Sequence, residues 1–81
     1  MFAEEINNLR NFTKFAIEYL HLEKVEPGVT EELYDTTNDQ LHTLAIHVLS
    51  LTTKEQLDEI NRKWIARGKE LPDLYFGGED E

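Results

Sequence analysis

The sequence predicts a small all-α domain, and three stretches of the chain lead to that prediction. Residues 41–51 form a long apolar run with four Leu and one Ala, and its length and Leu/Ala content favour a helix over a buried strand. Residues 2–24 and 54–67 repeat large apolar side chains at helical spacing. We therefore expect a compact bundle of three main helices, one short helix or turn after Pro27, and an appended C-terminal tail.

The apolar run at residues 41–51 is the segment that we expect the rest of the fold to cover. On a helix its apolar side chains sweep an arc of roughly 220°, well above the roughly 100° stripe of a half-buried helix. Thr37, followed by Gln40 three residues later, predicts a capping box at the start of this helix, with Asn38 and Asp39 as alternative caps. His42 falls inside the apolar arc, where we expect a partly buried imidazole with a hydrogen-bond partner, whereas His47 faces solvent.

Residues 2–24 predict one long first helix with two adjoining apolar stripes. The second stripe consists of Phe12, Phe15, Tyr19 and Leu22. We expect the apolar part of the tail to lie across this stripe and complete the core. The alternative is an exposed aromatic patch that serves a protein partner or a homodimer. The tail residues concerned are Leu71, Leu74, Tyr75 and Phe76.

Residues 54–67 predict the last helix, with a narrow apolar stripe. Thr53 with Gln56, or Thr52 with Glu55, predicts a capping box at its start, and Gly68 is the expected C′ residue after its end. Because the link before it is short, we expect this helix to pack close to the central one. The domain should span residues 1–76, with 77–81 as a flexible acidic tail. The apolar stripe consists of Leu57, Ile60 and Trp64, and Ile65 lies off it.

The charge of the chain is strongly negative, with 17 acidic and 8 basic residues and a net charge of −9. Residues 25–53 hold five acids and no base, as do residues 70–81. Only residues 54–69 carry an excess of bases. Such a field repels nucleic acid and lipid headgroups and attracts basic proteins. The acidic surface that we single out consists of Glu31, Glu32, Asp35 and Asp39.

Catalytic chemistry has few residues to use in this chain. There is no Cys, the one Ser lies inside the central helix, and the four glycines form no phosphate-binding loop. Two carboxylate-x-x-His spacings, Glu18 with His21 and Asp39 with His42, can share a metal on helices. That design needs further inward-facing carboxylates, and Glu18 and His21 fall on the solvent face. We expect no catalytic residue, no metal and no cofactor.

The start of the chain has no basic segment followed by an apolar one, and no run approaches about 18 apolar residues. We therefore expect neither a secretory signal nor a membrane span. The lack of cysteine fits a reducing compartment, and we expect a cytoplasmic protein without membrane partners.

The leading hypothesis is a non-enzymatic, acidic protein-interaction module, such as an inhibitor, adaptor or regulatory subunit. Small acidic helical proteins of this kind suit phages and other mobile elements. The first alternative is a DNA mimic that blocks a nucleic-acid-binding protein. The second is a helix-turn-helix regulator that uses the bases of residues 54–67. Direct nucleic-acid binding is disfavoured because Glu55, Asp58 and Glu59 open the candidate recognition helix.

Overall fold

The computed structural model describes residues 2–72, and this range contains four α-helices, one 3-10 helix and no strand. The all-α prediction is confirmed, but the predicted count of three main helices and one short element is slightly off. Leu74, Tyr75, Phe76 and the predicted tail at 77–81 lie outside the described residues. The elements are α1 (Phe2–Tyr19), η1 (Leu22–Lys24), α2 (Val29–Asp35), α3 (Asn38–Ser50) and α4 (Lys54–Ala66).

The predicted first helix of residues 2–24 is wrong at its C-terminal end, because α1 stops at Tyr19. His21 adopts a left-handed backbone with φ of 56°, which breaks the helix and costs a non-glycine residue about 1–2 kcal/mol. The chain then forms the 3-10 turn η1. This turn places Leu22 in the core, where only 2% of its surface is exposed. Burial of that side chain offsets the strained backbone before it.

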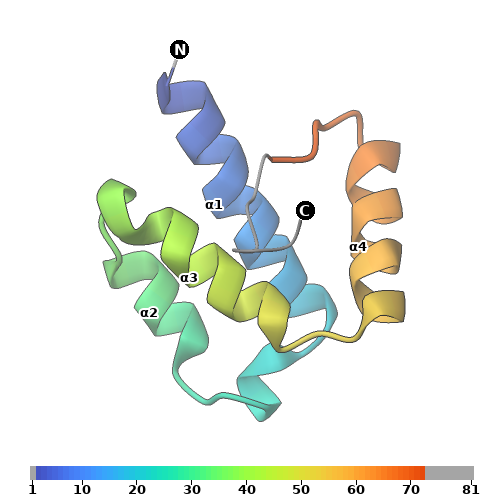
Figure 1. Cartoon of the computed structure of the whole chain (residues 1–81), viewed down its shortest axis with the longest axis horizontal. Helices are drawn as coiled ribbons and strands as arrows, with labels where there is room; N and C mark the ends of the chain where they lie inside the picture. The colour runs from blue at the N-terminus through green and yellow to red at the C-terminus, as the bar shows by residue number, and fades with distance from the viewer. Residues whose placement is uncertain (1, 73–81) are drawn as a thin grey trace, which may run out of the picture.

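α1 is the helix on which the other elements pack. It makes substantial contacts with η1, α2, α3 and α4, and Figure 1 shows α3 crossing it on one side while α4 stands on the other. The expectation that the short 51–53 link would hold α4 close to α3 is wrong, because α4 contacts mainly α1. Trp64 of the α4 stripe packs on the aromatic rings of Phe12 and Phe15 in α1.

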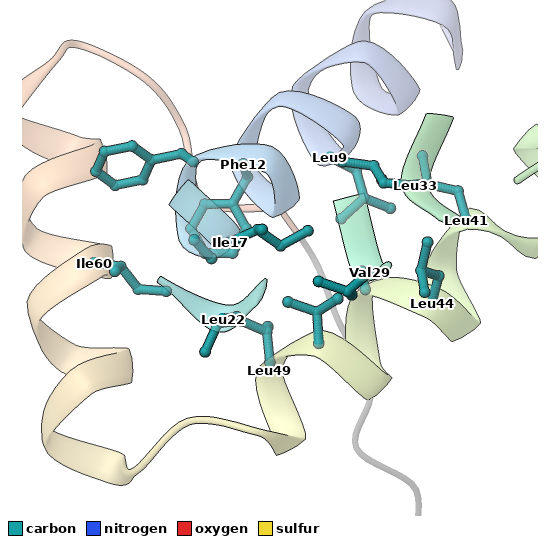
Figure 2. Close-up of a cluster of buried hydrophobic side chains, with 14 of the residues drawn as sticks. Leu9, Phe12, Ile17, Leu22, Val29, Leu33, Leu41, Leu44, Leu49 and Ile60 are labelled. Atoms are coloured by element: carbon teal, nitrogen blue, oxygen red, sulfur yellow. The ribbon is translucent and has the colours of Figure 1, made fainter. Parts of the chain in front are cut away.

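The core is a single apolar cluster to which every element contributes. Figure 2 shows labelled side chains from α1, η1, α2, α3 and α4 pointing into this shared interior. Most of the apolar side chains in the predicted run are buried as expected, while Ile46 and Leu51, at the two edges of its apolar arc on the helix, are only half-buried. The buried residues of α3 are Leu41, Leu44, Ala45, Val48 and Leu49.

The ends of α3 and α4 test the capping residues that the sequence predicts. Thr53 and Gln56 form the predicted capping box of α4, with bonds of 2.9 and 3.0 Å. Thr37 is the N-cap residue of α3, but its side chain makes no capping bond, so the capping box predicted there with Gln40 is wrong. Gly68 has a φ of 81° after α4, which confirms the predicted C′ glycine.

Candidate functional site

The junction between α2 and α3 is held from α1 by Arg10. Its Nη1 donates to the Leu33 carbonyl oxygen at 2.7 Å, and its Nη2 donates to the Thr36 carbonyl oxygen at 3.3 Å and to Asn38 Oδ1 at 3.0 Å. The guanidinium thus satisfies two carbonyl groups at the end of α2 and one side chain at the start of α3. These bonds tie the end of α2 to the start of α3 and so fix the angle at which the two helices meet.

The other end of α2 is held by Glu23 of η1. Its carboxylate accepts hydrogen bonds from the Gly28 N–H at 3.0 Å and the Thr30 N–H at 2.7 Å, so it caps two donors that the helix cannot satisfy itself. Hydrogen bonding from the Thr30 side chain, and then from the backbone N–H groups of Gly28 and Thr30, lowers the pKa of Glu23. Local capping patterns do not reveal this contact, because Glu23 lies before Pro27 and not at the N-cap position of α2, which is Gly28.

A third contact connects the loop before α2 to α3. His47 Nε2 and Glu26 Oε1 lie 2.7 Å apart. The prediction that His47 faces solvent is confirmed, since the side chain is exposed at this edge of α3. His42 is half-buried on the same helix. Together with Arg10 and Glu23, the contact between His47 and Glu26 fixes α2 at both ends relative to α3.

Between α2 and α3 lies an open groove of about 700 Å³. Four α3 residues at helical spacing form one wall of the groove, and Leu44, which is buried, is the apolar one among them. The α2 wall carries the carboxylates of Glu32 and Asp35. The lining residues are Glu32, Asp35, Thr36, Gln40, Thr43, Leu44 and His47.

Glu32 and Asp35 of the predicted acidic surface line this groove, whereas Glu31 and Asp39 do not. Glu31, Glu32, Asp35 and Asp39 are all exposed. Among residues 2–72 the ion pairs are those of Lys14 with Glu18, at 4.0 Å, and of His47 with Glu26. None of the four carboxylates therefore has a cationic partner within the described chain. Arg10, which reaches the same junction, uses its guanidinium on carbonyl and amide oxygens instead.

The structure divides the predicted aromatic stripe between core and surface. Phe12, Phe15 and Leu22 are buried, so these three side chains do not form an exposed patch. Trp64 of α4 covers the two phenylalanines, with ring centroids 5.6 Å from Phe12 and 5.4 Å from Phe15. Within residues 2–72 the cover is thus α4, a packing partner that the sequence analysis did not assign to this stripe.

Tyr19 is the one member of that stripe whose ring reaches the surface, with 38% exposure. Its hydroxyl donates to Glu59 Oε2 at 2.8 Å, which ties α1 to α4. This hydrogen bond raises the pKa of Tyr19. The other predicted contact residues, Tyr75 and Phe76, lie outside the described part of the chain.

No group of three or more His, Asp or Glu side chains within residues 2–72 has the arrangement of a metal site. Glu18 and His21 both lie exposed near the end of α1. Across the same range, no helix is long and apolar enough to cross a membrane. No family model, no curated protein and no solved structure matches this chain.

Proposed function

We propose that the protein is a non-enzymatic interaction module whose α2–α3 face binds a protein with a basic surface. The observation that supports this is the set of exposed carboxylates without cations, namely Glu31, Glu32, Asp35 and Asp39. These residues come from two helices whose relative orientation is fixed by Arg10, so the charges form one preorganised surface.

The placement of these charges works against the stability of α2. Glu31 and Asp35 are four residues apart on one helix, a spacing at which like charges destabilise by about 0.2–0.5 kcal/mol. Asp35 is also the last residue of α2, where the helix dipole favours a cation, and the last turn contains no base. A basic partner would relieve both repulsions. Glu31 and Glu32 lie in the first turn, where the helix dipole favours acids, so the unfavourable part of the pattern centres on Asp35.

The matched experiment compares two variants with the same change in net charge. The first neutralises Glu31, Glu32, Asp35 and Asp39 by conversion to the corresponding amides. The control neutralises Glu4, Glu5, Glu55 and Asp58, which are exposed elsewhere on the molecule. Tagged proteins are used for affinity capture from the native cells at increasing salt concentrations. The proposal expects a partner that the wild type and the control retain, that the first variant loses, and that high salt releases. Equal retention by all three proteins would contradict it.

The same surface supports a second candidate, a DNA mimic, in which the carboxylates take the place of backbone phosphates on a nucleic-acid-binding protein. The two candidates differ in the partner. Duplex DNA added during capture would displace this chain from a nucleic-acid-binding protein, because both ligands would occupy one basic site. Capture of a partner that does not bind DNA would exclude the DNA mimic, and the proposal of a general interaction module would stand.

A further inference from the structure

We infer that the groove between α2 and α3 binds an arginine side chain of the basic partner, with its aliphatic stem on Leu44 and its guanidinium on Glu32 and Asp35. This inference rests on the proposed function and assigns the position and chemistry of its main contact. The groove differs from the rest of the acidic surface because it combines two carboxylates with the apolar side chain of Leu44.

The α2 wall has hydrogen-bonding capacity that the described residues do not use. Ionised carboxylates are acceptors only, and neither Glu32 nor Asp35 accepts a side-chain hydrogen bond or an ion pair from any residue between 2 and 72. The one imidazole in the groove, that of His47, already contacts Glu26. The donors that these two carboxylates require must therefore come from solvent or from a ligand.

The α3 wall contributes an apolar side chain beside these carboxylates. Leu44 is 9% exposed and lies below Gln40, Thr43 and His47 on one face of the helix. A small inorganic cation would bind to the carboxylates alone and would gain nothing from a neighbouring apolar side chain. An apolar floor beside them suits a cationic side chain with a long hydrocarbon stem, which packs on apolar surface while its charged head stays near water.

The pair of carboxylates suits an arginine better than a lysine. Glu32 and Asp35 are three residues apart, so both point from one side of α2 into the groove. A planar guanidinium carries five donors and can bond to carboxylates in a bidentate manner, whereas an ammonium acts as a compact, strongly hydrated point charge. Two neighbouring carboxylates above an apolar floor therefore favour arginine.

The test uses the full chain labelled with ¹⁵N and two probes of equal charge, a hexa-arginine and a hexa-lysine peptide. The inference expects amide shifts that concentrate on residues 32–47, and binding of hexa-arginine at least about threefold tighter than that of hexa-lysine. Glu32→Gln should weaken the binding of hexa-arginine about tenfold, the size expected for a lost hydrogen bond to a charged group.

Glu31→Gln is the matched control, because it removes the same charge from the adjacent residue, which does not line the groove. It should weaken binding less than about threefold, since its effect is only a screened field. Thr43→Arg supplies the opposite change. Thr43 is exposed and lines the groove, so an arginine at this position should occupy the groove and reduce hexa-arginine binding. Thermal melting of each variant establishes that it is folded.

The possible failures are distinguishable. Equal effects of Glu31→Gln and Glu32→Gln, or equal affinity for the two peptides, would overturn the arginine groove while the acidic interaction face would stand. Shifts spread over all acidic segments would overturn both proposals. If the wild type instead self-associates, and charge reversal of Arg62 and Lys63 on α4 abolishes this, then the occupant is a second copy, and the inference is wrong.

Discussion

Arg10 of α1 donates a 2.7 Å hydrogen bond to the carbonyl oxygen of Leu33, which lies 23 residues further along the chain in α2. The same guanidinium reaches Thr36 and Asn38, so one side chain fastens three positions across the α2–α3 junction. This relationship links the stability of the fold to the geometry of its acidic face.

Arg10→Ala should lower the free energy of unfolding by about 2 kcal/mol, because carbonyl groups at a partly buried helix end lose their donor. Denaturant unfolding measures this change. Lys14→Ala is the control on the same helix, where an exposed 4.0 Å ion pair with Glu18 and an exposed contact with the Tyr34 ring should each contribute less than about 1 kcal/mol. Similar losses for the two variants would show that Arg10 does not fasten the junction.

Glu23 should make the stability depend on pH in the acidic range. Its pKa in the folded protein is lowered from the ordinary value of 4.5, so the folded state favours the ionised carboxylate. The stabilisation is fully present above pH 4.5 and is lost as the pH falls through the lowered folded-state pKa. Melting curves of the wild type and of Glu23→Gln should therefore differ at neutral pH and converge in acid. A constant difference at all pH values would contradict this origin.

Phe12 and Tyr19 belong to one sequence stripe, but their substitutions should have different effects. Phe12 is 1% exposed and packs edge-on against Trp64, so Phe12→Ala should cost about 3–5 kcal/mol of stability. Tyr19 is 38% exposed, and Tyr19→Phe, which removes only the hydrogen bond to Glu59, should cost less than about 1 kcal/mol. Denaturant unfolding tests both. Equal costs would mean that the stripe is not divided between core and surface.

Two threonines that precede helices provide a comparison of caps. Thr53→Ala should lower the stability by about 1 kcal/mol, because it removes the side-chain bond to the Gln56 N–H. Thr37→Ala should change it by only a few tenths of a kcal/mol, since Thr37 makes no side-chain capping bond. The difference between the two midpoints in denaturant is the measurement. A larger loss at Thr37 would contradict the capping assignment.

Local signals in the sequence predicted the helices well. The capping box at Thr53, the glycine at 68 and the apolar spacing of Ile60 and Trp64 all act within a few residues, and the structure has each of them. The end of α1 could not be predicted in this way. The left-handed backbone of His21 ends the helix and allows Leu22 to be buried in the core. Helical periodicity contains no information on the distant residues that bury Leu22.

Contacts between distant segments account for the remaining differences. The basic residue Arg10 reads as part of a solvent face on the helix alone, yet its long side chain reaches two carbonyl groups of another segment. The acidic residues of the candidate site could be identified from charge, because 25–53 contains no base. The groove could not be identified, since it exists only after α2 and α3 are brought side by side.

The attachment of α4 has a consequence for how the molecule opens. This helix rests mainly on α1, through Ile60, Trp64 and the hydrogen bond that the Tyr19 hydroxyl donates to Glu59. It should therefore detach as a separate cooperative unit before the three remaining helices come apart. The only tryptophan of the chain lies on α4, so its fluorescence would report the detachment, while circular dichroism would follow the whole helical content. Two non-coincident melting curves from these probes would reveal a partly open form in which the acidic face is still intact.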